Sequence, residues 1–356
     1  MVAQSNNFAM ESGIFHTTYA QDMTLRRTPL MRLRLLLVIA AALVFPFLAD
    51  GYQLTLANQI GITAIGAIGL NILTGFTGQI SLGQGAFMAV GAYGSGLLAT
   101  RLGLSWWATI PVACLITAAV GAVFGIPSLR LKGLYLAIAT LAAQEIIEWL
   151  ITHWTALTGG VDALVVPAPT LFGARINTDF RFYWVILLFA TLTTLYAVNL
   201  FRSKVGRAFI AIRDQDIAAE VMGVNTFQYK LLAFATSSFF VGLSGALLAH
   251  WRGIVNYERF TIETSIFYLA VVIIGGLGSV RGSIFGAIFM TLLPAVLSNL
   301  GQAFGDSIPG LAGILPFVQQ AVFGLTIILF LVFEPEGLAK IWRNIKDYFR
   351  LWPFSY

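Results

Sequence analysis

Two carboxylates inside an apolar stretch are the first candidates for chemistry in this sequence. Glu145 and Glu148 lie within 133–151, and their spacing of three residues places both on one face of a helix. A charged group at the centre of a bilayer costs about 2.5–3.5 kcal/mol, so neither carboxylate is expected to face lipid. Two interpretations stay open. The pair is either a proton or ion relay of a self-sufficient secondary transporter, or a structural pair that faces another helix or solvent.

A second group of polar side chains is neutral and lies in or beside a glycine-rich stretch, GFTGQISLGQGAFMAVGAYGSG at 75–96. Amides and hydroxyls donate and accept hydrogen bonds without charge, which suits a pathway that passes a solute without trapping it. Glycine runs are poor helix interiors, and unwound backbone at membrane depth is tolerated only where protein buries it or where it lines a wet cavity. The candidate pathway residues are Asn71, Gln79, Ser81, Gly83, Gln84 and Gly85.

A further glycine-rich stretch, GGLGSVRGSIFGA, occupies 275–287. Gly278, Gly282 and Gly286 recur every four residues, which would align them on one stripe of a helix. Small residues at that spacing let helices approach closely in lipid. Tight packing and a broken helix both explain these glycines, and the two interpretations can coexist.

A polar segment at 202–230 differs from the rest of the chain. Its alanine-rich centre and the glycine at 223 predict a short helix over 214–222, with Asp214 and Asp216 in the first turn. A helix that lies on anionic lipid needs a basic polar face, whereas this one carries three acidic residues. We therefore expect it to dock into a groove of another protein.

Several classes of chemistry have no support in the sequence. No lysine follows a glycine, so the chain has no phosphate-binding loop for ATP. The lone cysteine, Cys114, and three scattered histidines offer neither a disulfide nor a metal-binding spacing. We predict no catalytic residue, no metal and no cofactor.

The elements that position these residues must lie in lipid. Of the 356 residues, 58% are hydrophobic and only 10% are charged, against about 25% charged in an ordinary soluble domain. A membrane-spanning helix needs about 20 mostly apolar residues. The sequence predicts an all-α polytopic membrane protein with about ten such helices, at 33–49, 54–73, 81–99, 106–126, 133–151, 182–201, 231–250, 262–280, 282–300 and 314–333.

The basic residues predict the orientation. With both termini in the cytoplasm, 16 of the 21 basic residues fall on the inner side and 5 on the outer side. This bias accounts for the net charge of +5 and gives no indication of nucleic-acid binding. We expect a cytoplasmic tail at 1–32 rather than a cleaved signal peptide, a permease domain at 33–333 and a cytoplasmic tail at 334–356.

Six stretches carry a resemblance to a known family. They are LNILTGFTGQISLGQGAFMAVGAY at 70–93, GLYLAIATLAAQEI at 133–146, TGGVDAL at 158–164, GRAFIAIRDQDIAAEVMGVNTFQYKLLAF at 206–234, VVIIGGLGSVRGSIFGA at 271–287 and FEPEGL at 333–338. In this order and spacing the sequence resembles the LivM-type permeases of bacterial branched-chain amino acid ABC importers. The resemblance spans about 54–340, and one departure is Gln84, where many relatives have histidine.

The resemblance implies a subunit of the inner membrane that acts with a second, LivH-like permease, two cytoplasmic ATPases and a periplasmic binding protein, surrounded by membrane lipid. It implies that the helix near 214–222 is the coupling helix of the ATPases. The coupling residues are then Arg207, Arg213, Asp214, Ala218, Ala219, Glu220 and Gly223. Related permeases for urea and short-chain amides share most of these motifs, so a permease for urea or a short-chain amide is the alternative.

Overall fold

The computed structural model describes residues 29–128, 131, 133–171, 174–305 and 311–351, and most of the predicted N-terminal tail lies outside them. The described chain is helical apart from two short strand pairs. Its membrane-spanning candidates are α2 (Pro29–Leu48), α3 (Gly51–Thr77), α4 (Gln84–Arg101), α5 (Trp106–Ser128), α6 (Leu134–His153), α8 (Asp179–Arg202), α11 (Thr226–Arg252), α12 (Ile262–Gly275), α13 (Val280–Gly305) and α14 (Leu311–Phe333). The other helices are α7 (Thr155–Thr158), α9 (Lys204–Asp214), α10 (Asp216–Val221), the 3-10 helix η1 (Tyr257–Phe260) and α15 (Leu338–Leu351).

The all-helical polytopic class is confirmed, and each of the ten predicted ranges coincides with a helix. Among the described residues, seven helices are long and apolar enough to cross a membrane, namely α3, α5, α6, α8, α11, α13 and α14. Helix α2 has 20 residues, and its stretch at Leu33–Leu48 is apolar. With 14 residues, α12 is about 21 Å long, which is less than the bilayer core of about 30 Å.

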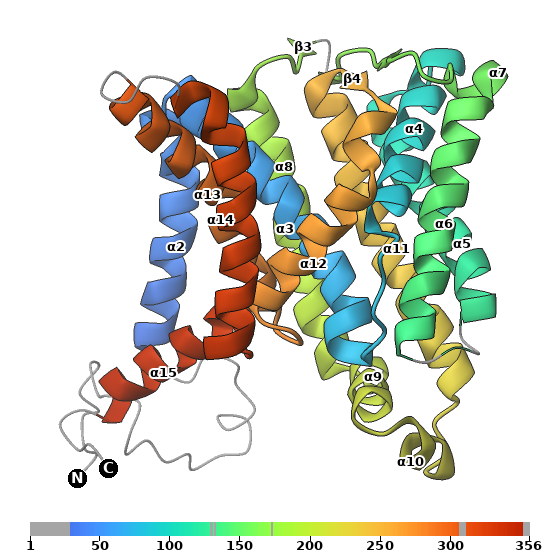
Figure 1. Cartoon of the computed structure of the whole chain (residues 1–356), viewed down its shortest axis with the longest axis vertical. Helices are drawn as coiled ribbons and strands as arrows, with labels where there is room; N and C mark the ends of the chain where they lie inside the picture. The colour runs from blue at the N-terminus through green and yellow to red at the C-terminus, as the bar shows by residue number, and fades with distance from the viewer. Residues whose placement is uncertain (1–28, 129–130, 132, 172–173, 306–310, 352–356) are drawn as a thin grey trace, which may run out of the picture.

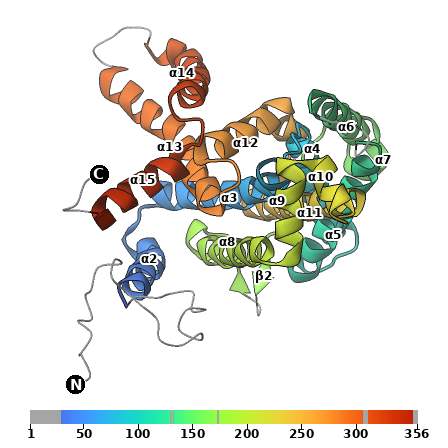
Figure 2. The ribbon, with the colours of Figure 1, turned by 90° about the horizontal axis from the view of Figure 1, so that it is seen from below.

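Two helices form the centre of the molecule and others form its periphery. In the most apolar window of α3, 89% of the residues are buried, and α11 packs beside it with α4 and α5. In α14 none of the corresponding window is buried, so this helix presents its side chains to the surroundings. Figures 1 and 2 show α13 and α14 standing out from the central helices, with α15 lying across their lower ends.

Glycines account for the closest helix contacts. A Cβ on Gly91 of α4 would lie 2.2 Å from the carbonyl oxygen of Gly242 on α11, so neither helix could come this near with larger residues. In the second glycine-rich stretch, Gly282 and Gly286 of α13 pack against Gly275 of α12. The expected stripe is wrong at Gly278, which has φ +73° and lies in the turn before α13.

The upper end of the molecule carries the strands. Strand β1 (Leu164–Val165) pairs antiparallel with β4 (Ile254–Val255), and β2 (Thr170–Leu171) forms a hairpin with β3 (Ala174–Arg175). The indole N–H of Trp106 donates to the carbonyl oxygen of Thr170 at 2.9 Å, which ties the hairpin to α5. Helices α9, α10 and α15 lie at the opposite end (Figure 1).

Candidate functional site

The start of α4 lies inside the molecule, and side chains from other helices bond its free backbone groups. The first N–H groups of a helix have no partner within that helix, and the residue before α4, Gly83, has no side chain to cap it. The amide of Gly85 donates to Oγ of Ser265 at 2.8 Å. The amide of Ala86 donates to Oε1 of Gln144 at 2.6 Å. Helices α12 and α6 therefore supply the cap that α4 lacks.

Gln144 joins three segments of the chain at this point. Its Oε1 also accepts from Oγ of Ser265 at 3.2 Å, and its Nε2 donates to the carbonyl oxygen of Phe260 at 2.6 Å. One turn earlier on α6, the hydroxyl of Thr140 accepts from the amide of Leu82 at 2.9 Å. Because α4 and α12 both begin here, we call this group the helix-start cluster. It consists of Gly85, Thr140, Gln144, Phe260 and Ser265.

The helix-start cluster lies near the middle of the membrane-spanning region. Gln144 is about 15 Å from the start of α6, a helix about 30 Å long and thus as long as a bilayer core is thick. Figure 1 shows α4 in the upper half of the molecule, reached by extended chain that rises from the lower end of α3. Non-helical backbone at this depth must find its hydrogen bonds within protein, and the cluster supplies them.

Glycine is required where the two helix starts meet. A Cβ on Gly85 would lie 2.8 Å from the carbonyl oxygens of both Phe260 and Thr261, which is closer than real Cβ atoms come to other atoms. A Cβ on Gly83 would lie 3.1 Å from the carbonyl oxygen of Thr140. Steric contact therefore explains why glycines are found at the start of α4.

Of the six predicted pathway residues, Gly85 belongs to the helix-start cluster, and Ser81, Gly83 and Gln84 lie next to it in the chain. Gly83 and Gly85 are described above. Gln84 is 2% exposed and donates from Nε2 to the carbonyl oxygen of Gly66 on α3 at 3.0 Å. Ser81 is buried, and its hydroxyl accepts from the amide of Gly83 at 3.3 Å. In this conformation these side chains are packed inside the protein.

Four residues of the cluster were missed by sequence reasoning, and one of them, Phe260, takes part through its backbone carbonyl. The other three are neutral polar residues within apolar runs and lie outside the glycine-rich stretch at 75–96, namely Thr140, Gln144 and Ser265. The signal that could have found Gln144 is its place in LAAQEI, since an amide inside a membrane span needs partners on both of its ends.

The two carboxylates of α6 take no part in the hydrogen bonds of the helix-start cluster. Glu145 is exposed and Glu148 is half-buried. Neither forms an ion pair with any residue in the described part of the chain. Their face of α6 is open to whatever surrounds this chain.

The predicted helix over 214–222 is shorter and is preceded by another. Helix α9 ends at Asp214, the backbone is extended at Gln215 with φ −162°, and α10 runs from Asp216 to Val221. The expectation that Asp214 opens the short helix is therefore wrong, whereas Asp216 does lie in its first turn. Gly223 follows with φ +88°, a backbone conformation that favours glycine.

Helix α10 is the lowest element of the molecule in Figure 1 and exposes an apolar surface. Ile217, Val221 and Met222 are 66%, 82% and 83% exposed. Of the two alanines, Ala219 is buried against the chain and Ala218 is exposed, as is Glu220. Such a surface at the tip of a protrusion suits contact with another protein.

Arg213, at the end of α9, connects this protrusion to the membrane helices. Its Nη1 donates to the carbonyl oxygen of Gly75 in the last turn of α3 at 3.3 Å, and Asp214 holds the guanidinium at 2.9 Å. Beside it, Asn71 of α3 accepts from the amide of Gly278 and donates to the hydroxyl of Ser283. Three ends converge here: α3, α9 and the turn between α12 and α13. We call Asn71, Gly75, Arg213 and Gly278 the transmission junction.

The two remaining predicted residues lie close to this region. Gln79 is 5% exposed, lines a cavity of about 170 Å³ with Arg213 and Lys230, and leaves its Oε1 without a hydrogen-bond partner. Arg207 is exposed on α9, and its Nη1 donates to the carbonyl oxygen of Arg202 at 3.2 Å. In the part of the chain that the structure describes, no three His, Cys, Asp or Glu side chains could hold a metal ion.

Residues 52–331 match the family described as branched-chain amino acid transport system / permease component. The chain is 32% identical to the LivM permeases of the high-affinity branched-chain amino acid transport systems of Salmonella typhimurium and Escherichia coli, over 88% of this chain and 76% of each relative. A probable LivH permease of Methanocaldococcus jannaschii is 28% identical, over 79% of this chain and 89% of that protein. No solved structure matches the chain.

The match covers most of the chain, including every residue of the helix-start cluster and of the transmission junction. Its apolar helices agree with a multi-pass membrane protein. The chain belongs to the family of permease components of branched-chain amino acid ABC transport systems.

Proposed function

We propose that this chain forms the membrane pathway of an importer together with a second, LivH-like permease and that two cytoplasmic ATPases drive it. A periplasmic binding protein delivers branched-chain amino acids at the end that carries the strands. The observation that carries the proposal is α10, an exposed apolar tip joined by Arg213 to the membrane helices. A chain without an ATP site of its own needs such a contact with a separate ATPase, so that ATP hydrolysis there can change the conformation of the membrane helices.

The solute passes between the two permeases along the open face of α6. An acidic side chain at mid-depth is tolerated where it faces water or protein, and Glu145 is exposed on the surface of this chain. Directly behind it the starts of α4 and α12 bring positive helix-dipole ends toward mid-membrane, where they favour a carboxylate. Ser81, Gly83, Gln84 and Gly85 form the wall that moves when the pathway opens.

Closure of the ATPases moves α10, and the transmission junction passes this motion to α3 and to the turn before α13. Arg207, Asp214, Ala218, Ala219, Glu220 and Gly223 belong to the docking and hinge surface. Asn71 keeps the turn attached to α3 while Arg213 pulls on Gly75. Gln79 lines the cavity near the cytoplasmic exit. Both termini are cytoplasmic, because the basic residues gather at the end that carries α10 and α15.

The experiment that tests the proposal is copurification of the assembled importer, followed by uptake of leucine. Exchanging Met222 for Glu or Glu220 for Arg should weaken retention of the ATPases about tenfold or more, since an interface anchor typically contributes 1.4 kcal/mol or more. Asp162→Arg, an exposed acid in the loop at the opposite end, is the matched control for ATPase retention. Normal ATPase retention and normal uptake in both α10 variants would rule out docking at α10.

Uptake assays in cells that produce the assembled importer identify the solute. Competition of labelled leucine uptake by isoleucine and valine, with no effect of urea, is the expected pattern. Competition by urea or short-chain amides would move the assignment to that class of substrate. Uptake by the lone chain in liposomes under a proton or sodium gradient, lost in Glu145→Gln/Glu148→Gln, would favour a self-sufficient ion-coupled transporter instead.

A further inference from the structure

Helix α15 is amphipathic and lies across the lower ends of the membrane helices (Figures 1 and 2). Its apolar residues recur at helical spacing along one stripe, at Leu338, Ile341, Trp342, Ile345 and Tyr348. Trp342 and Tyr348 are 52% and 63% exposed. A helix of this type, with aromatic residues at its surface and cations on the other face, lies in the plane of the membrane interface.

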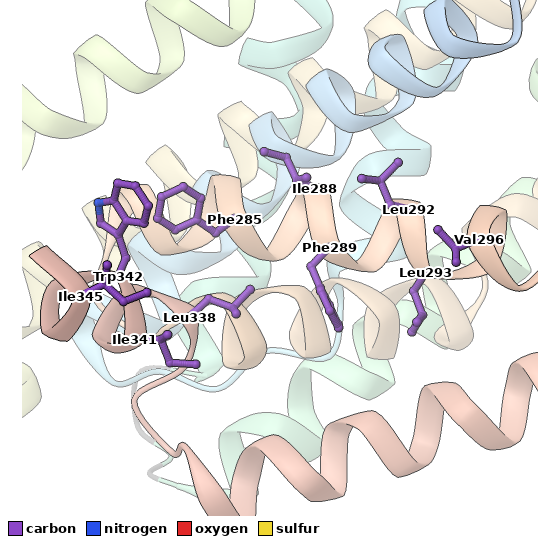
Figure 3. Close-up of a pocket in the computed structure, with 10 residues that line it drawn as sticks. All are labelled: Phe285, Ile288, Phe289, Leu292, Leu293, Val296, Leu338, Ile341, Trp342 and Ile345. Carbon is purple, nitrogen blue, oxygen red and sulfur yellow. The ribbon is translucent and has the colours of Figure 1, made fainter. Parts of the chain in front are cut away.

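An apolar groove of about 580 Å³ runs between α15 and α13. Figure 3 shows Phe285 of α13 beside Trp342 of α15, while Phe289 and Leu292 continue the lining further along α13. The groove is open to the outside, because Leu292, Trp342 and Ile345 are all exposed. It extends from the membrane interface along a helix that crosses the bilayer.

A polar cavity of about 550 Å³ adjoins the groove, and Phe285 and Trp342 line both. Its charged residues are four cations and two carboxylates, namely Arg281, Lys340, Arg343, Lys346, Glu336 and Asp347. Glu336 already bonds Lys340 at 3.1 Å and Arg343 at 2.7 Å. Arg281 is exposed and forms no ion pair with any described residue. The cavity therefore keeps a net positive charge.

We propose that the groove and the cavity together form a binding site for one anionic glycerophospholipid of the leaflet on the α10 side. The phosphate group lies in the basic cavity beside Arg281, and an acyl chain lies along Phe289 and Leu292. Charge complementarity selects this occupant, since an apolar groove alone would take any lipid. Basic pockets beside membrane helices recognise anionic headgroups in this way.

The site has a structural consequence for the transporter. Arg281 follows the turn that contains Gly278, and the amide of Gly278 donates to Asn71 of α3. The headgroup would therefore lie next to the transmission junction. A bound lipid would also fix α15 against α13, the helix that stands out from the centre. This proposal does not depend on which solute is transported.

The test uses the assembled importer in lipid nanodiscs of phosphatidylethanolamine, with a small fraction of phosphatidylglycerol that carries brominated acyl chains. Bromine quenches tryptophan fluorescence at short range, and the difference from a Trp342→Phe variant isolates the signal of Trp342. We expect stronger quenching by brominated phosphatidylglycerol than by brominated phosphatidylethanolamine. Arg281→Gln/Lys346→Gln should weaken the preference about fivefold for each charge removed. Arg101→Gln/Arg175→Gln, two exposed arginines at the opposite end, should leave it unchanged.

Three outcomes would overturn the proposal. Equal quenching by both lipids would mean that the groove takes lipid without regard to charge. Quenching in the isolated chain that disappears in the assembled importer would mean that the second permease covers the groove. Displacement of the brominated lipid by inorganic phosphate alone would mean that the basic cavity is a simple anion site.

Discussion

At the scale of single residues, Gln144 does the most to hold the broken helices together. One neutral side chain accepts from two groups and donates to a third, from α4, α12 and the segment before α12. A carboxylate could not donate to Phe260, and a lysine could not accept from Ala86. An amide is therefore suited to both ends of this contact without placing a charge at mid-membrane.

Replacement of Gln144 by Leu should lower the thermal stability of the purified protein. It would leave buried backbone groups of Ala86 and Phe260 without partners, at a cost of about 1–3 kcal/mol each. The measurement is the melting temperature in detergent by size-exclusion chromatography with fluorescence detection. Gln320→Leu, an exposed glutamine on α14, is the matched control. Equal melting temperatures for the two variants would contradict this role of Gln144.

Gly85→Ala should also be destabilising, although it adds a single methyl group to a helix. The added Cβ would meet two backbone oxygens at 2.8 Å, and backbone cannot move aside as a flexible side chain can. The same exchange at Gly324 of α14, where a Cβ meets nothing within 4 Å, should stabilise slightly because alanine favours helix. Comparison of melting temperatures and leucine uptake checks the contrast, and equal effects at both glycines would refute it.

At the scale of elements, a variant of Arg213 can distinguish docking of the ATPases on α10 from transmission of their motion to α3. It lies at the end of α9, behind the exposed tip of α10, and its bond to Gly75 ties α9 to α3. Arg213→Gln should leave ATPase retention unchanged, because it does not touch the exposed apolar side chains. Leucine uptake per ATP hydrolysed should fall severalfold, because the tip would move without pulling α3.

The comparison for Arg213 is Lys204→Gln, which removes an exposed cation at the other end of the same helix. This variant should keep the ratio of uptake to hydrolysis. Loss of ATPase retention in Arg213→Gln would mean that the residue belongs to the docking surface. An unchanged ratio in both variants would mean that the transmission junction does not carry the motion.

The elements were predictable from the sequence to different degrees. Apolar runs located the ten long helices that the structure describes, because burial in lipid demands such runs, and the glycine at 223 marked the end of α10. The break at 78–83 left only a composition signal, since its bonds come from residues about 60 and 180 positions away. Gln144 and Ser265 could not be paired with α4 by local pattern, because nothing short of the fold brings them together.

At the scale of the whole molecule, the two ends differ in what they carry. The upper end holds the strand pairs and α7, while the lower end holds α9, α10 and α15 (Figure 1). A periplasmic protein and a cytoplasmic motor must approach opposite ends of the same chain. The side of the membrane on which α10 lies therefore decides whether α10 can contact a cytoplasmic ATPase.

Thiol labelling in intact cells measures that sidedness directly. The native Cys114 is 1% exposed within α5, so it should not react and need not be removed. A cysteine in place of Val161, 64% exposed in the upper loop, should be labelled by a membrane-impermeant maleimide. A cysteine in place of Met222, 83% exposed at the tip of α10, should react only after the membrane is permeabilised. If Met222→Cys reacts in intact cells while Val161→Cys does not, α10 faces away from the compartment that holds ATP, and it could not dock on an ATPase.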